Sequence, residues 1–126
     1  MEKLCKIRGI QRAVNQFELG FEKRYGICLN EGMALCSLLK AGSLSSGEIG
    51  ELLGLSSSNT SKVIKSIEGK QLVGRVLGEK DKRQMYFSLT PRGRELISSL
   101  KCEDVETAPL LKEILTNKAA ETKNTR

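Results

Sequence analysis

Two short segments carry the side chains with which this sequence could bind a polyanion. Residues 56–66 are rich in serine and add an asparagine and two lysines, and residues 79–84 are rich in lysine and arginine. Residues 56–94 hold nine basic and three acidic residues, a balance of +6 that equals the net charge of the whole chain. A localised basic segment suggests a polyanionic partner such as nucleic acid, and a solvated charged surface is the alternative.

Catalytic chemistry is harder to assemble from these residue types. The chain has no histidine, so the usual general base, the commonest metal ligand and the Ser–His or Cys–His nucleophile pairs are missing. We therefore expect no enzyme, no metal site and no cofactor. The four cysteines, Cys5, Cys28, Cys36 and Cys102, form no Cys-x-x-Cys pair and fit no zinc motif. Reduced, idle thiols are expected, with a redox switch at Cys5 or Cys102 as the alternative.

The length of 126 residues suits one domain with a single core. The longest apolar run, Met33 to Cys36, is too short to cross a bilayer, and no apolar leader follows the N-terminus. A cytoplasmic protein with no membrane partner is expected.

Apolar spacing predicts the elements that position the polar segments. A long helix over residues 3–25 ends at Gly26, a plausible C-cap. Its apolar stripe has the spacing of one helix face: Ile7, Ile10, Val14, Phe17 and Phe21. This stripe could belong to an intramolecular core. Because the segment from residue 30 to residue 90 has a core of its own, a second copy of the chain is the simpler cover.

Two helices are predicted next. The first begins at Asn30, a suitable N-cap, and ends at Gly42. The second is capped by Ser45 or Ser46, with Glu48 at capping-box spacing from Ser45. Aliphatic residues at helical spacing are expected in the core: Leu35, Leu38, Leu39, Ile49, Leu52 and Leu53.

The serine-rich segment begins a fourth helix over residues 56–71, with Ser56 as its cap. Gly54 and Leu55 form a tight connection before it. The inner face has helical spacing: Thr60, Val63, Ile64 and Ile67. Polar residues lie off that face: Ser57, Ser58, Asn59, Ser61, Lys62 and Lys65.

Strand-like alternation replaces helical spacing after Leu72. Two alternating runs, residues 73–78 and 85–90, flank the charged loop and predict a β-hairpin with a basic tip. Lysines that only keep the hairpin soluble are the alternative. Thr90 and Pro91 begin a fifth helix, and a short helix is expected near residues 107–117.

Helix, tight turn, helix and basic hairpin is the order of a winged helix-turn-helix. The major groove of B-DNA is about 12 Å wide and admits one helix, which must bury one face and present short polar and basic groups on the other. A cationic hairpin loop can then reach phosphates or the minor groove, where the potential is negative.

In these motifs the sequence resembles the MarR family of bacterial transcriptional regulators. The resemblance rests on GEIGELLGLSSSNTSKVIKSIEGKQLV at residues 47–73, KDKR at 80–83 and SLTPRGREL at 88–96. The family's usual wing reads Arg-Asp-Arg-Arg, and its next strand ends Leu-Thr-x-x-Gly. Where the family usually has glycine just before the strand, this chain has Gln71.

The resemblance implies a fold that is mostly α with a small β-hairpin wing, in a homodimer that binds a pseudo-palindromic operator in double-stranded DNA. The exposed polar residues of the fourth helix would face the major groove. Lys80, Lys82 or Arg83 would be the wing contact, and Asp81 would brace the wing by pairing with Arg83. Dimer contacts would come from the first helix and from Leu110, Leu111 and Ile114. Small molecules or oxidants often tune such regulators, and the effector here is unknown.

The expected layout is one winged-helix domain over residues 1–126. Residues 30–94 form its DNA-binding core, and residues 3–25 and 95–118 form dimerisation helices. Two other functions stay open: a winged-helix module for protein interaction, and a metal- or redox-responsive repressor of similar shape.

Overall fold

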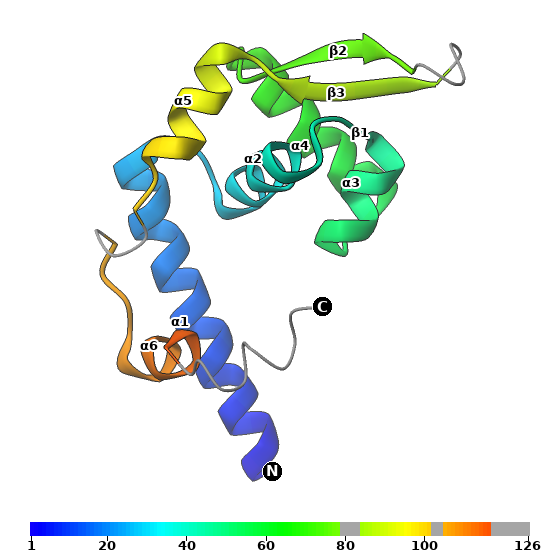
Figure 1. Ribbon diagram of the computed structural model, residues 1–126. Coiled ribbons are helices and arrows are strands. Elements are labelled where there is room, and N and C mark those ends of the chain that lie inside the picture. Colours follow the sequence, from blue (N-terminus) through cyan, green and yellow to red (C-terminus); the bar gives the residue numbers. More distant parts are fainter. Residues whose placement is uncertain (79–83, 102–104, 117–126) are drawn as a thin grey trace. The chain divides into compact units, whose positions relative to one another are not determined.

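The computed structural model describes residues 1–78, 84–101 and 105–116. Helices and a small sheet follow one another along the chain (Figure 1) in this order: α1 (Glu2–Tyr25), α2 (Leu29–Ala41), β1 (Leu44–Ser45), α3 (Ser46–Leu53), α4 (Ser57–Gly69), β2 (Val73–Leu77), β3 (Met85–Leu89), α5 (Pro91–Ser99) and α6 (Pro109–Leu115). The predicted fold class, mostly helical with a small hairpin, is confirmed. The first of the three strands was not predicted.

The chain divides into two compact units. One contains residues 1–26 and 101–126, and the other contains residues 27–100. Residues 95–99, assigned from the sequence to a dimerisation arm, belong to α5 and therefore to the second unit.

The first unit is built on α1, which packs with α6. Gly26 ends α1 as predicted, since its φ of 76° is left-handed and its amide donates to the Glu22 carbonyl. Near the end of α1, the Tyr25 hydroxyl lies 3.0 Å from both the amide nitrogen and the carbonyl oxygen of Lys101. Gly20 lets Val105 approach, because a Cβ at that position would lie 3.1 Å from Val105 Cγ1.

The second unit has an aliphatic core in which α2 packs against α3, α4, α5 and β3. Its most buried side chains are Ile27, Leu35, Leu38, Ile49 and Ile67. Two residues predicted in the core are not there: Leu39 is 38% exposed and Leu52 is 63% exposed. Helical spacing placed both residues on the buried face, but none of the described residues buries them.

The N-terminus of α2 also differs from the prediction. Its N-cap is Cys28, not Asn30, and Glu31 closes a capping box with it. The predicted capping box between Ser45 and Glu48 at α3 is confirmed, with bonds of 3.2 Å and 2.8 Å. Asparagine is the better N-cap by propensity. Here, however, the Glu31 carboxylate accepts from the amide of Cys28, three residues earlier, and the helix begins there.

The sheet has the strand order β1-β3-β2, and both pairings are antiparallel. Leu44 pairs with Phe87, and Arg75 pairs with Phe87 from the other side. At the end of the hairpin Thr90 caps α5 as predicted, accepting from the Gly93 amide at 3.0 Å. A Cβ on Gly93 would lie 2.0 Å from the Leu72 carbonyl oxygen, so only glycine lets α5 begin this close to β2.

Candidate nucleic-acid interface

The turn between α3 and α4 fixes the geometry of the candidate site. Gly54 ends α3 in the left-handed region at φ 69°. Its amide donates to the Glu51 carbonyl and the Leu55 amide donates to the Gly50 carbonyl, the bond pattern of a Schellman motif. Ser56 then starts α4, with its Oγ accepting from the Asn59 amide at 3.1 Å. Three residues therefore connect two helices, as in a helix-turn-helix.

The two helices cross at small residues. A Cβ on Gly50 would lie 2.6 Å from Thr60 Oγ1, so the glycine makes room for the threonine. The Thr60 hydroxyl donates to the Ser56 carbonyl at 2.7 Å. Its methyl group can then pack inward, as the sequence predicted, and the residue is 2% exposed.

The helix α4 has one buried and one exposed face. Thr60, Ile64 and Ile67 are buried, and Val63 is half-buried. All six polar residues proposed from the sequence are exposed: Ser57, Ser58, Asn59, Ser61, Lys62 and Lys65. The first turn holds no acidic residue, so no side-chain carboxylate there neutralises the partial positive charge at the start of the helix. Such a surface suits an anionic partner.

Hydroxyl groups collect at the start of this helix. A small hollow of about 80 Å³ is lined by Ser46 and Gly47 of α3 and by Ser57, Thr60 and Ser61 of α4. The beginnings of the two helices therefore share one surface depression. Helix N-termini with short donors accommodate phosphate oxygens well.

The wing is a regular hairpin as far as the structure describes it. The strands β2 and β3 extend beyond the helices of the second unit (Figure 1), and the Gly78 amide donates to the Gln84 carbonyl at 3.0 Å. Arg75 on β2 binds Glu68 at the end of α4 through two bonds of 2.8 Å and 3.3 Å. This bond ties the hairpin to α4. The tip residues Lys80, Asp81, Lys82 and Arg83 lie outside the described residues.

Sequence reasoning missed a buried carboxylate behind α4. Glu31 is 2% exposed. It accepts from the Ser66 hydroxyl and from Lys70 Nζ, which lies 3.0 Å from both carboxylate oxygens. Burial raises the pKa of this carboxyl, but the bonds from Ser66, the Cys28 amide and Lys70, with the lysine's charge, outweigh it and leave the pKa below its ordinary value. The carboxylate is therefore ionised at neutral pH.

The junction between α4 and β2 explains the departure at Gln71. Its φ is 65°, in the left-handed region. The Gln71 amide donates to Glu68 and the Leu72 amide to Ile67, a second Schellman motif. The position therefore takes the conformation that suits the glycine usual in the family, although a side chain is present.

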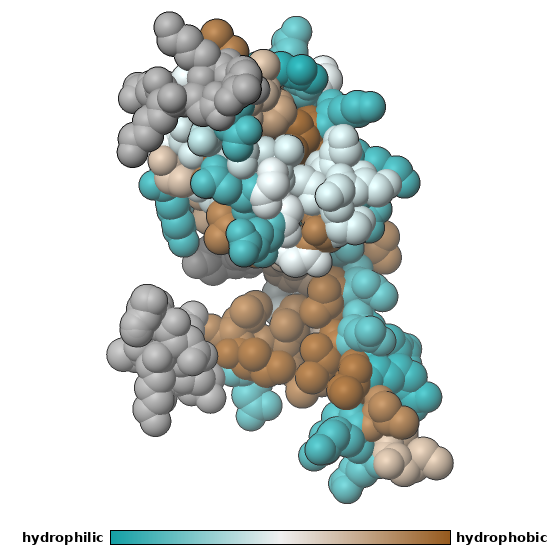
Figure 2. Space-filling model, turned by 90° about the vertical axis from the view of Figure 1, so that its right-hand side faces the viewer, coloured by the Kyte–Doolittle hydropathy of each residue, from teal (hydrophilic) through white to brown (hydrophobic). Residues whose placement is uncertain are grey.

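The residues proposed for dimer contacts lie in the first unit. Ile7, Ile10, Leu110 and Ile114 are between 37% and 48% exposed. Val14 and Leu111 are half-buried, and Phe17 and Phe21 are buried. Figure 2 shows a continuous apolar patch, and the exposed apolar side chains of α1 and α6 belong to this unit. An apolar patch of this kind is typical of an interaction surface.

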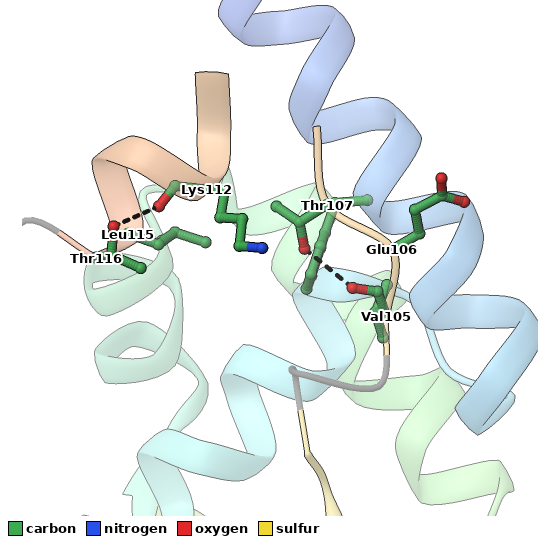
Figure 3. Close-up of a pocket in the computed structure, with 7 residues that line it drawn as sticks. Val105, Glu106, Thr107, Lys112, Leu115 and Thr116 are labelled. Carbon is green, nitrogen blue, oxygen red and sulfur yellow. Dashed lines mark hydrogen bonds between the residues drawn. The ribbon is translucent and has the colours of Figure 1, made fainter. Parts of the chain in front are cut away.

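A pocket of about 580 Å³ opens in the same unit. Phe17, Val105 and Leu115 supply apolar walls, and the side chain of Lys112 extends between Leu115 and Thr107 in the close-up (Figure 3). Glu106 also lines the pocket, and its carboxylate points away from Lys112 in the same view. A largely apolar cavity with a cation inside could hold a small molecule that carries an anionic group.

The cysteines give no redox pair among the residues that the structure describes. Cys5 is exposed, Cys28 and Cys36 are half-buried, and these three are free thiols. Burial raises the pKa of the Cys28 thiol, which lowers its reactivity. Cys102, the second thiol of the proposed switch, is outside the described residues. In the described part of the chain, no helix is long and apolar enough to span a bilayer.

Comparison with known proteins agrees with this architecture. The model of a family described as MarR family matches residues 27–85, from the segment before α2 to the first residue of β3. A curated relative, the uncharacterized HTH-type transcriptional regulator YwaE of Bacillus subtilis, is 29% identical over 93 residues, which cover 74% of this chain. The match spans 54% of that relative, about half of its length.

Solved structures share the fold. A mutant MarR from E. coli complexed with operator DNA has a TM-score of 0.68 and 18% identity, over 82% of this chain and 73% of that one. The Bordetella bronchiseptica protein BpsR, whose DNA binding is regulated by 6-hydroxynicotinic acid, has a TM-score of 0.72 and 16% identity, over 100% of this chain and 95% of that one. The winged helix-turn-helix expected from the sequence is thus confirmed as a fold.

Proposed function

We propose that this chain is a MarR-type transcriptional regulator that binds double-stranded DNA with α4 in the major groove. The observation that carries the proposal is the exposed polar face of α4, held outward by a buried apolar face and by the turn at Gly54. The mutant MarR of similar fold is complexed with operator DNA. A protein-interaction module would not need this concentration of hydroxyl groups and lysines.

Within this interface we assign different roles to different side chains. Lysines and helix N-terminal groups supply affinity through phosphates, and side chains that reach base edges supply sequence preference. Asn59 and Lys62 fit base contacts, because amides bind adenine and lysines bind guanine in the major groove. Ser46, Ser57 and Ser61 around the hollow fit phosphate contacts.

The wing completes the interface in this proposal. Lys80, Lys82 and Arg83 would contact the backbone or the minor groove, and Asp81 would pair with Arg83 and not with DNA. The support is the hairpin register and the basic composition of the loop. Lysine forms poorer bidentate contacts than arginine, so the wing is expected to add affinity more than sequence preference.

A homodimer formed by the first unit belongs to the same proposal. It is supported by the exposed apolar residues of α1 and α6. Two copies would place two α4 helices on half-sites about one helical turn apart. The pocket beside Lys112 is the proposed site for an effector with an apolar body and an anionic group.

The experiment measures binding to labelled duplexes at several salt concentrations. Replacing Lys80, Lys82 and Arg83 by alanine should weaken binding to all duplexes by about tenfold or more and flatten the salt dependence, because fewer counterions are released. Lys62→Ala should instead change which duplexes are selected from a random pool, at a cost of about 1–3 kcal/mol for the preferred base pair.

Lys40→Ala is the matched control, since Lys40 is an exposed lysine in the last turn of α2 and is not among the residues proposed to contact DNA. Its binding curve should match that of the wild type. Failure of the wild type to bind any duplex at low salt would contradict the proposed function. An unchanged salt slope in the triple variant would contradict the wing assignment alone.

A further inference from the structure

At the end of α4 farthest from the turn, one buried carboxylate accepts hydrogen bonds from two side chains. Ser66 and Lys70 both donate to the Glu31 carboxylate, which belongs to α2 and lies 35 and 39 residues away in sequence. Lys70 Nζ is 3.0 Å from each carboxylate oxygen, and the Glu31 side chain is 2% exposed. The carboxylate therefore joins two elements through directional bonds.

These donors lie beside the proposed DNA-binding face. Residues four apart on a helix are neighbours on adjacent turns, so Ser66 follows directly after Lys62 along the helix surface. Toward the core, the other contacts of α4 are the apolar ones of Ile64 and Ile67. The bonds between Glu68 and Arg75 join α4 to the hairpin, but that pair is solvent-exposed. Apolar contacts have no preferred direction and tolerate small rotations of a helix about its axis. Hydrogen bonds are directional, so they resist such a rotation.

The carboxylate is itself fixed at its other side. The Cys28 amide donates to Glu31 Oε1 at 2.7 Å, within the capping box that starts α2. The helix α2 packs against α3, α4 and α5. Glu31 is consequently a rigid reference point, and the bonds from Ser66 and Lys70 set the rotation of α4 against it.

We propose that Glu31 is a positioning residue for DNA recognition: by binding Ser66 and Lys70 it fixes the rotation at which α4 presents Asn59, Lys62 and Lys65. This inference rests on the proposed function. Glu31 does not touch DNA, and its effect on affinity passes through the orientation of α4.

The test compares Ser66→Ala with Ser37→Ala. Each variant loses one hydroxyl, but the Ser37 hydroxyl donates within α2 to the Met33 carbonyl. The probe is a labelled duplex selected by the wild type from a random pool, and a random duplex at low salt if none is selected. At a temperature where all variants are folded, Ser66→Ala should bind about fivefold more weakly, with an unchanged salt slope. Ser37→Ala should bind like the wild type.

Two further variants separate positioning from stability. Ser66→Thr keeps the hydroxyl and should restore affinity. Glu31→Gln should weaken binding, and the double variant Glu31→Gln with Ser66→Ala should lose less than the product of the two single effects, because both act through one bond network. Affinities within twofold of the wild type for all folded variants would overturn the proposal, even if their melting temperatures fall.

A second measurement needs no DNA. Amide hydrogen exchange in residues 64–70 should be faster in Ser66→Ala and Glu31→Gln than in the wild type, while exchange in α5 stays the same. Unchanged exchange in residues 64–70 would overturn the positioning role. A wild type that binds no duplex would refute the proposed function, and amide exchange would then decide on Glu31 independently.

Discussion

Gln71 has a strained, left-handed backbone conformation. It stands where the MarR family usually has glycine. Among the described residues it is the one non-glycine with a positive φ. A left-handed residue with a Cβ costs about 1–2 kcal/mol, while glycine gains unfolded-state entropy worth about 0.5–1 kcal/mol. The cost of the left-handed conformation is larger than the entropic cost of glycine, so Gln71→Gly should stabilise the protein by about 0.5–1 kcal/mol. Urea unfolding measures the change.

The control for this prediction is Gln71→Ala, which shortens the side chain and keeps the Cβ. Its free energy of unfolding should stay close to that of the wild type. Thr90 Oγ1 donates to the Gln71 carbonyl at 2.7 Å, and this bond uses backbone only on the Gln71 side, so it survives both changes. Equal stability of Gln71→Gly and Gln71→Ala would show that φ is not the source of strain.

At the scale of elements, the contact between α2 and α4 should make the protein sensitive to acid. The bonds from Ser66, the Cys28 amide and Lys70 hold the pKa of Glu31 below its ordinary value, although burial opposes them. A carboxyl with a lowered folded pKa stabilises the fold above its unfolded value, near pH 4.3, and loses that contribution as the pH falls through the folded pKa. Stability should therefore fall below about pH 4.3.

The comparison is with Glu31→Gln. This variant should be less stable by about 2 kcal/mol at pH 7, because the buried side chain loses its charge and with it the charge-assisted hydrogen bonds from Ser66 and Lys70. Its stability should also change less with acid. Glu68→Gln removes a carboxyl whose pKa is also lowered, by Arg75, but the pair is solvent-exposed and worth little. Parallel unfolding curves against pH for wild type and Glu31→Gln would contradict the prediction.

The elements show what a sequence reveals and what it hides. Caps depend on residues a few positions apart, so Ser56 and Thr90 were identified correctly, and Ser45 was one of the two residues proposed for α3. The cap at Cys28 was missed because propensity favoured Asn30, whereas a carboxylate three residues on decided it. Strand β1 has two residues, too few for any alternating pattern.

The candidate interface also has a part that the sequence predicts and a part that it does not. Helical spacing alone separates the exposed polar face of α4 from its buried face. It could not find Glu31, because the contact with Ser66 spans 35 residues and depends on how α2 crosses α4. Leu52 shows the converse limit: spacing placed it inside, yet it is 63% exposed, because no element in the described part of the chain covers it.

For the whole molecule, the proposed dimer rests on the apolar residues that α1 and α6 leave exposed. Ile7 is 47% exposed and Ile114 is 48% exposed. Placing a carboxylate at either position would desolvate a charge in the dimer interface. We therefore expect Ile7→Glu and Ile114→Glu to weaken dimerisation by about tenfold or more, as measured by light scattering across a concentration series.

Leu52→Glu is the matched control, since Leu52 is a more exposed aliphatic residue that belongs to the second unit. It should leave the mass unchanged, because the proposal places it outside the dimer interface. If dimerisation sets the spacing of two α4 helices, Ile114→Glu should also abolish the preference for paired half-sites and leave binding to a single half-site intact. A wild type that remains monomeric at tens of micromolar, or a Leu52→Glu variant that alone becomes monomeric, would move the interface away from α1 and α6.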